Sequence, residues 1–316
     1  MTRIALLGAG FTRNWGGWLA SELIGELCGR LIDRPNVNQL LRLSGNFEQV
    51  LAARRALAER EPSNEQALED VRRLEEAILT SFASVNAALA RLPDLRLSGT
   101  SDMRCSIRQF LARFDAIFTL NQDLLLELHY DGMGLESRGR WQHYYFPGIV
   151  LTRGWLRERR EERVGQTLLV GNVPVAPPDR YQPVFKLHGS VNWRTDEGGR
   201  VLVVGTAKEK AAPGSELLRW YHEEFRRYLM RVDTRIMVIG YGFADQHINS
   251  LLLDAAKRAS LAMYLVDPKG REALSAHPEL MLIPLLGFCQ RRFGQVFEDP
   301  DSPAFQSIDR FFSDQR

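Results

Sequence analysis

Residues 4–12 read Ile-Ala-Leu-Leu-Gly-Ala-Gly-Phe-Thr, an apolar run that ends in two closely spaced glycines. Four apolar residues without polar alternation are typical of a parallel strand that is buried on both faces. Glycines directly after such a strand let a dinucleotide pyrophosphate approach the backbone amides, because no Cβ intervenes. The full Gly-x-Gly-x-x-Gly pattern is absent, since Arg13, Asn14 and Trp15 precede the next glycine. A tight strand-to-helix turn is therefore the alternative interpretation.

Similar short apolar runs recur along the chain. Most are followed at once by Gly, Asn, Asp or His, and then by an amphipathic stretch. This rhythm is typical of an α/β fold, and it predicts a Rossmann-like parallel sheet with helices on both faces. The runs that predict strands are 4–7, 116–120, 184–187, 201–204, 236–239 and 263–266.

Two regions interrupt the rhythm within what we expect to be a single domain of residues 1–316. Residues 35–99 predict a helical insertion, in which apolar side chains recur every three or four positions from Leu68 to Leu92. We interpret this stripe as core packing, and a subunit contact is the alternative. Residues 132–183 are rich in Gly, Pro, Arg and aromatic residues, and they predict an irregular excursion.

The composition excludes several classes of protein. The 316 residues include 41 Lys or Arg and 39 Asp or Glu, so the chain lacks the excess of positive charge that is typical of nucleic-acid-binding proteins. Three widely spaced cysteines argue against a disulfide framework and against structural zinc. No apolar run approaches the ~20 residues of a membrane span. We therefore expect a cytoplasmic protein that holds no metal and binds neither membranes nor nucleic acid directly.

Polar side chains follow two of the predicted strands. Asn121 and Asp123 come directly after the run 116–120, and His188 follows the run 184–187. Ligands of an open parallel sheet bind outside the carboxyl ends of its strands. Asn121 can orient a ribose or a water molecule, and His188 has the side chain best suited to general base work near neutral pH. Helix capping by Asn121 and Asp123, and a purely structural role for His188, are the alternatives.

Two later strands end in a comparable way. The run 236–239 continues into Gly-Tyr-Gly-Phe-Ala-Asp at 240–245, where Gly240 and Gly242 permit close approach to a phosphate or ribose. Asp245 can cap the following helix, a role that is compatible with ligand binding. Asp267 follows the run 263–266 and can contact a ribose or adenine edge, although a simple Asp-Pro turn is an equal alternative.

Taken together, these strand ends resemble the sirtuin family and its prokaryotic sirtuin-like relatives. The matching motifs, in order, are GAGFT at 8–12, TLNQD at 119–123, LHGS at 187–190, VGT at 204–206, GYGFAD at 240–245 and VD at 266–267. The resemblance implies that NAD lies across the strand ends. The residues it implies are Gly8, Ala9, Gly10, Phe11 and Thr12 at the pyrophosphate, Gly205, Thr206, Gly240, Gly242, Asp245 and Asp267 toward the adenosine side, Asn121 and His188 at the nicotinamide ribose, and Asp123 at the nicotinamide amide.

The departures from the family indicate which branch the chain is similar to. Protein-deacylating sirtuins carry four zinc-binding cysteines, whereas residues 132–183 contain no cysteine. The sequence is similar to the bacterial antiphage NAD-hydrolase branch. This similarity implies that NAD is the substrate and that the activated protein depletes NAD. It also implies a homo-oligomer and a HerA-type ATPase or other activating partner. An NAD-dependent deacylase or ADP-ribosyltransferase, and a non-catalytic sensor of NAD or ADP-ribose, remain the alternatives.

Overall fold

The computed structural model describes residues 1–93, 95, 106–130, 140–151, 155, 158–173, 178–202 and 216–313. Its centre is a seven-stranded sheet in which every pair of neighbouring strands is parallel. The Rossmann-like fold class predicted from the sequence is therefore confirmed. In sheet order the strands are β11 (Leu285–Cys289), β10 (Ala262–Val266), β9 (Thr234–Ile239), β1 (Thr2–Leu7), β2 (Ala116–Thr119), β6 (Tyr181–Lys186) and β3 (His143–Tyr145).

The strand order reverses next to β1. The chain moves outward from β1 through β2 to the edge strand β3, comes back to β6, and then crosses to β9 on the other side of β1. The inner strands are buried on both faces, which explains their uninterrupted apolar sequences. An open sheet binds ligands at such a reversal, at the carboxyl ends of its strands. The topology therefore directs attention to the loops that follow β1, β2, β6 and β9.

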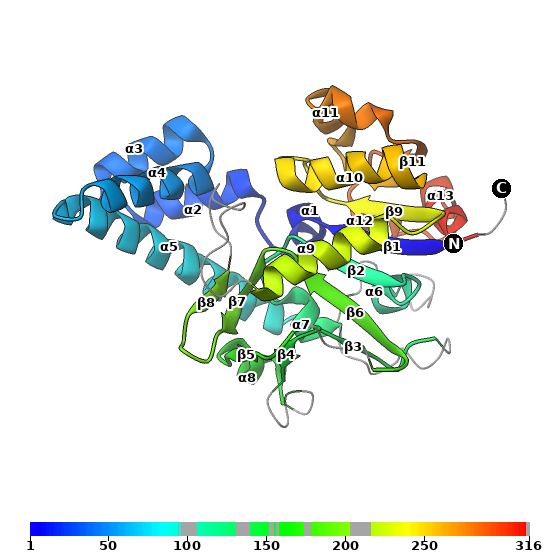
Figure 1. Ribbon diagram of the computed structural model, residues 1–316, viewed down its shortest axis with the longest axis horizontal. Helices are drawn as coiled ribbons and strands as arrows, with labels where there is room; N and C mark the ends of the chain where they lie inside the picture. Colours follow the sequence, from blue (N-terminus) through cyan, green and yellow to red (C-terminus); the bar gives the residue numbers. More distant parts are fainter. Residues whose placement is uncertain are drawn as a thin grey trace.

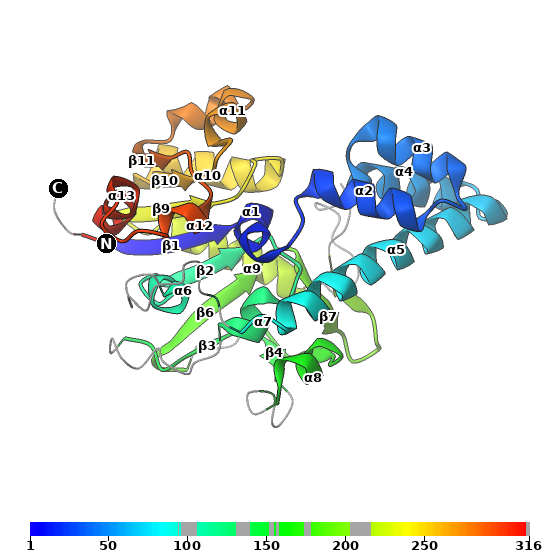
Figure 2. The ribbon, with the colours of Figure 1, turned by 180° about the vertical axis from the view of Figure 1, so that it is seen from behind.

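Helices cover both faces of the sheet, as Figures 1 and 2 show from opposite sides. One face carries α9 (Glu216–Leu229) and α10 (Gln246–Ala259), and the other carries α1 (Ala9–Thr12), α6 (Ile107–Leu111), α12 (Phe293–Val296) and α13 (Pro303–Phe311). The remaining short helices near the sheet are η1 (Arg13–Trp15), α7 (Leu125–His129), α8 (Arg160–Val164), α11 (Gly270–Ser275) and η6 (Pro278–Leu282).

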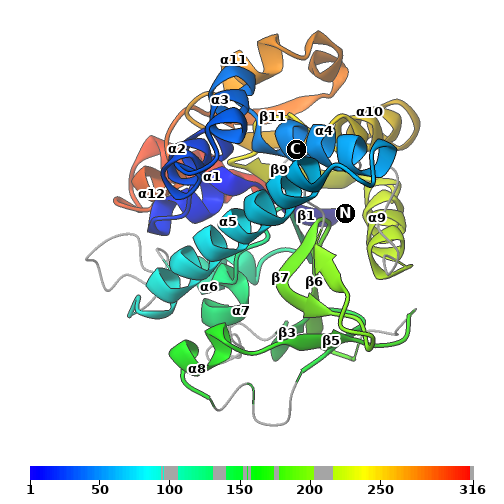
Figure 3. The ribbon, with the colours of Figure 1, turned by 90° about the vertical axis from the view of Figure 1, so that its left-hand side faces the viewer.

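Four helices project from the side of the sheet at which β1 ends and α1 begins (Figures 1 and 3). They are α2 (Ala20–Arg30), α3 (Pro35–Ser44), α4 (Phe47–Arg60) and α5 (Glu65–Ala90). Their buried side chains, such as Leu27, Leu41 and Leu74, form a second apolar core. The C-terminal part of α5 instead contributes Val85 and Leu89 to the main core. The stripe that predicted a helix thus packs against both cores, and the helical region begins before residue 35.

The region 132–183 is more regular than its composition predicted. It contributes β4 (Ile149–Val150) and β5 (Leu168–Val170) to a second, four-stranded sheet with β7 (Gly189–Arg194) and β8 (Arg200–Leu202). The apolar run at 201–204 begins in β8, which pairs antiparallel with β7, so the prediction of a parallel strand there is wrong. Edge strands of a small sheet need no long apolar run, because only part of their surface is covered. No described helix is long and apolar enough to cross a membrane.

Candidate functional site

Asn121 and His188 lie at matching positions beyond two neighbouring strands. Thr119 of β2 pairs with Lys186 of β6, and the backbone N–H of Leu187 donates to the carbonyl oxygen of Thr119 at 2.9 Å. Each of the two candidate residues comes two positions after this paired end. The structure therefore brings the loops that carry both residues together at the carboxyl edge of the sheet.

The amide group of Asn121 is held by the loop that follows β1. Its Nδ2 donates to the carbonyl oxygen of Gly8 at 3.0 Å and to Oγ1 of Thr12 at 2.8 Å. These bonds occupy both amide hydrogens and fix the side-chain orientation. Oδ1 is then the atom of Asn121 that can accept a hydrogen bond from a water molecule or a ribose hydroxyl. Thr12, predicted at the pyrophosphate, is buried, and its hydroxyl oxygen accepts from Asn121.

His188 and Asp245 form a buried pair. His188 Nε2 lies 2.9 Å from Asp245 Oδ2, and both residues are less than 9% exposed. A carboxylate beside one ring nitrogen fixes the tautomer, so the lone pair of the neutral ring lies on Nδ1. The carboxylate also stabilises the imidazolium that forms when the ring accepts a proton. The geometry suits a general base with its orienting acid.

The other oxygen of Asp245 caps α10. Oδ1 accepts from the backbone N–H groups of His247 at 3.0 Å and Ile248 at 3.4 Å. The capping role expected from the sequence is therefore present together with the contact to His188. Both carboxylate oxygens of Asp245 therefore have partners within the protein.

Two histidines that the sequence did not single out lie next to this pair. The ring of His222, on α9, packs against that of His247, on α10, with the ring centroids 4.9 Å apart and the planes tilted by 58°. His222 Nε2 donates to the carbonyl oxygen of Leu187 at 3.0 Å. Burial, with the nearby charges of His188 and His247, lowers the pKa of His222 to about 4. No local pattern marks His222 as a site residue, because only the packing of α9 on α10 brings it there.

The glycines after β1 and β9 pack against each other. A Cβ on Gly10 would lie 2.7 Å from the Cα of Gly240, and a Cβ on Gly8 would lie 2.5 Å from the carbonyl oxygen of Gly240. Gly240 itself has a φ of +64°. Close approach of two loops therefore requires these glycines, where the sequence indicated room for a pyrophosphate. Gly242 differs, because a Cβ there would meet open space.

The first loop also departs from the expected phosphate cradle in its helix. α1 spans only Ala9–Thr12 and continues as the short helix η1. The N–H of Gly10 donates to the carbonyl oxygen of Gly240 at 2.9 Å, so that donor is used within the protein. Phe11 is buried between Trp15 and Phe293, with ring centroids at 5.1 and 5.3 Å. Its side chain is a core residue, and Ala9 is the exposed member of this loop.

The two remaining acidic residues lie at strand ends. Asp123 Oδ1 accepts from the N–H of Leu125 at 3.0 Å, a local bond just before α7, whose N-cap is Leu124. Asp267 lies directly after β10, and burial raises the pKa of its carboxyl group. Its Oδ1 accepts from the N–H of Lys269 at 2.7 Å, as in a local turn. Gly205 and Thr206 lie outside the described residues.

A small cavity lies beside Asn121. Its volume is about 10 Å³, close to what one water molecule needs. Its polar lining residues come from α1, from β2 and the loop after it, from α7 and from the end of β6; they are Thr12, Thr119, Asn121, Asp123, Glu127 and Lys186.

Lys186 and Glu127 form a buried ion pair that the sequence reasoning missed. Lys186 Nζ lies 2.6 Å from Glu127 Oε1, 2.5 Å from the carbonyl oxygen of Asp123 and 2.9 Å from Ser190 Oγ. Both charged side chains are at most 1% exposed. Burial raises the pKa of Glu127, and the charge of Lys186 opposes that shift. A lysine inside an apolar strand was the available signal, because buried lysines require a partner.

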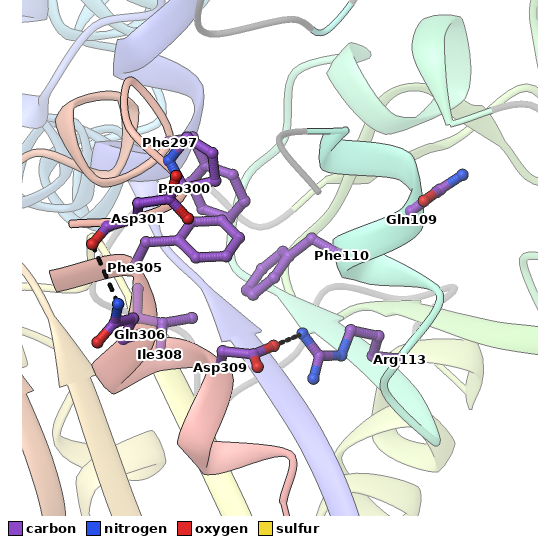
Figure 4. Close-up of a pocket in the computed structure, with 10 residues that line it drawn as sticks. All are labelled: Gln109, Phe110, Arg113, Phe297, Pro300, Asp301, Phe305, Gln306, Ile308 and Asp309. Carbon is purple, nitrogen blue, oxygen red and sulfur yellow. Dashed lines mark hydrogen bonds and ion pairs between the residues drawn. The ribbon is translucent and has the colours of Figure 1, made fainter. Parts of the chain in front are cut away.

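A larger cavity of about 170 Å³ lies elsewhere (Figure 4). It is lined by α6, α13 and the segment after α12, and Arg113 pairs with Asp309 at 2.6 Å along its wall. Because α6 leads into the start of β2, this cavity is at the amino ends of the strands, opposite Asn121 and His188. Its position separates it from the polar strand ends. Among the described residues, no group of three or more His, Cys, Asp or Glu could hold a metal ion.

A model of the SIR2-like domain family matches residues 115–281. The chain belongs to the SIR2-like domain family. This membership fits an NAD-utilising enzyme. The matched range includes Asn121, His188 and Asp245 and begins after the glycine loop at 8–12. No curated protein matches the chain.

Proposed function

We propose that the protein is an NAD glycohydrolase that cleaves NAD to nicotinamide and ADP-ribose. One observation carries the proposal: Asn121 and His188 each lie two residues beyond paired strand ends near the reversal of strand order, and Asp245 pairs with His188. A fixed amide acceptor and an oriented base at one edge are the groups that a hydrolytic step requires.

The chemistry follows from the leaving group. The bond between ribose C1′ and the pyridinium nitrogen breaks, its electron pair goes to the nitrogen, and neutral nicotinamide leaves without protonation. The ribose passes through an oxocarbenium-like state, as in other glycosyl transfers. Water then adds to C1′ and gives ADP-ribose and one proton. Asn121 Oδ1 orients the water or the ribose hydroxyls, and His188 Nδ1 accepts the proton while Asp245 stabilises the imidazolium.

The cysteine content favours this activity over peptide deacylation. Three cysteines in 316 residues are fewer than the four of the zinc module in deacylating sirtuins. Hydrolysis needs only the glycosidic-bond site, whereas deacylation also needs a bound acyl-lysine peptide. We therefore propose the hydrolase over the deacylase or ADP-ribosyltransferase, and we extend the proposal to an antiphage effector that depletes NAD when activated.

The projection formed by α2–α5 supports a proposal about assembly. It exposes large apolar side chains, including Ile32 at 82% and Leu43 at 75%. We propose that this projection forms a homo-oligomer contact or binds an activating partner such as a HerA-type ATPase. Light scattering tests the first part, since a mass near 36.0 kDa at every concentration contradicts self-association.

The decisive experiment measures nicotinamide release from NAD. Asn121→Ala removes the oriented acceptor, and we expect at least a 100-fold loss of turnover, in the range typical of a lost catalytic positioning group. Asn36→Ala, at an exposed site on α3, is the matched control and should retain full turnover. An acylated lysine peptide in parallel reactions tests the deacylase alternative. Near-normal turnover of Asn121→Ala contradicts the mechanism, and release that requires the peptide contradicts the hydrolase.

A further inference from the structure

The long helix α5 extends from the projection to the main sheet (Figure 2). It spans Glu65–Ala90, about 39 Å at the usual rise per residue, and this range has neither glycine nor proline that would bend it. Leu74 and Ile78 pack in the core of the projection, whereas Val85 and Leu89 pack in the core of the main sheet. One continuous helix therefore joins the two cores.

A buried asparagine on α5 holds the loop that carries Asn121. Asn86 is 2% exposed, and its Oδ1 accepts from the backbone N–H of Leu124 at 2.9 Å. Leu124 directly precedes α7 and follows Asn121 by three residues, so this bond anchors the end of the loop on which Asn121 lies. Asparagine is unfavourable inside a helix, because its side chain competes for backbone hydrogen bonds. The contact with Leu124 explains its presence at this buried position of α5.

A second contact docks the other end of α7 on the same helix. His129, the last residue of α7, is fully buried, and its Nε2 donates to the carbonyl oxygen of Leu89 at 2.7 Å. Thus α5 contacts the start of α7 through Asn86 and its end through Leu89. The loop 121–124 lies between β2, which is held by the sheet, and α7, which is held by α5.

The position of Asn121 therefore depends on contacts at both ends of this loop. Its amide donates to Gly8 and Thr12, which sets its orientation, while its backbone follows the loop that Asn86 anchors. A displacement of a reacting group by about 1 Å costs on the order of 100-fold in rate. Substrate binding is spread over more contacts, so losing this anchor should lower turnover more than it weakens binding.

We propose that Asn86 is a positioning residue for catalysis, through which α5 makes the projection part of the catalytic machinery. Asn86 acts through the loop 121–124 and Asn121 rather than by contact with NAD. This inference rests on the proposed function for the reaction that Asn86 affects. It gives the helices α2–α5 a role in turnover besides the proposed assembly contact.

The test separates turnover from substrate binding and from stability. Asn86→Leu removes the acceptor and keeps the branching of the side chain, whereas Asn86→Asp keeps an acceptor oxygen. Ser81→Ala is the matched control, because Ser81 is buried on the same helix and its hydroxyl has no hydrogen-bond partner among the described residues. Nicotinamide release from the whole protein at several NAD concentrations gives kcat and KM, and thermal unfolding gives Tm.

The expected results differ between the three variants. We expect Asn86→Leu to lower kcat at least about tenfold while KM changes less than about threefold. Asn86→Asp should recover kcat to within about threefold of the wild-type value, since asparagine and aspartate accept equally well from the N–H groups at a helix start. Ser81→Ala should match the wild-type protein in kcat and KM.

Hydrogen–deuterium exchange follows the anchor without requiring activity. The peptide that covers residues 121–129 includes the N–H of Leu124, which Asn86 protects. We expect this peptide to exchange faster in Asn86→Leu than in the wild-type protein, and to exchange at the wild-type rate in Asn86→Asp and Ser81→Ala.

The outcomes separate this inference from the proposed function. Normal kcat in a folded Asn86→Leu protein overturns the inference, as does a loss that Asn86→Asp does not recover. If Asn86→Leu does not fold, Asn86→Ala takes its place, because alanine removes the acceptor without adding bulk. A wild-type protein that releases no nicotinamide from NAD contradicts the hydrolase, and unchanged exchange in Asn86→Leu then also overturns the anchor.

Discussion

His222 is expected to make the protein lose stability as the pH falls from about 6.5 toward 4. The folded protein lowers the pKa of His222 to about 4, mainly by burial and then by the charges of His188 and His247, from an ordinary value of 6.5. The unfolded chain therefore takes up a proton at a higher pH than the folded chain does. The contribution to the free energy of unfolding is complete above pH 6.5 and is lost as the pH falls through this window. A shift of this size corresponds to about 3 kcal/mol.

The assay is urea unfolding of the wild-type protein and of His222→Gln at several pH values between 7 and 4. The glutamine variant lacks the titrating ring. Between pH 7 and 4, its free energy of unfolding should therefore decrease less than that of the wild-type protein, by up to about 3 kcal/mol. His277→Gln, on the loop before η6, is the control and should follow the wild-type curve. The same pH dependence in wild type and His222→Gln would refute the assignment of this titration to His222.

Three further predictions concern the contacts at the strand ends. Gly240→Ala should destabilise the protein by about 2 kcal/mol or more in thermal unfolding, because the added Cβ would lie 2.5 Å from Gly10 and the φ of residue 240 is positive. Gly25→Ala on α2 is the control, since its Cβ would meet open space and should not destabilise the protein. Asp245→Asn should lower nicotinamide release at least about 100-fold with little change in Tm, because asparagine still caps α10 but no longer stabilises a charged His188; normal release removes Asp245 from the mechanism. Lys186→Met should cost about 3–5 kcal/mol by leaving Glu127 buried and unpaired, and adding Glu127→Gln should recover part of that loss in urea unfolding. No recovery in the double variant contradicts the pairing.

The central sheet could be predicted because its inner strands are buried on both faces. Five apolar runs correspond to β1, β2, β6, β9 and β10. The edge strands β3 and β11 were not predicted, because β3 is only three residues long and Gly287 interrupts the apolar side chains of β11, most of which stay partly exposed. Leu285 of β11, for example, is 50% exposed. The second sheet was also not predicted, because its strands are short: β4 and β5 pair with each other over only two residues each.

The sequence predicts which residues of the candidate site follow strands, but it does not predict which of these residues contact one another. Asn121, His188 and Asp245 all follow apolar strands, so the rule for parallel sheets locates them at one edge. Their partners depend on strand order, which the sequence does not state. β6 and β9 are separated in the sheet by β1 and β2, yet His188 reaches Asp245 through the loop that follows each strand. His222 and Glu127 lie on helices, where a single polar residue resembles any solvated position until the packing is known.

The contacts at the carboxyl edge join four loops into one unit. Asn121 ties the loop after β2 to the loop after β1, and His188 ties the loop after β6 to the start of α10. Gly10 against Gly240 closes the set by joining the loops after β1 and β9. Because residues in one network do not contribute independently, the energetic role of each contact depends on the others. The glycines thus contribute to the site by allowing these loops to contact each other. Glycines directly after a strand therefore indicate either phosphate binding or close backbone packing, and the sequence alone does not separate the two.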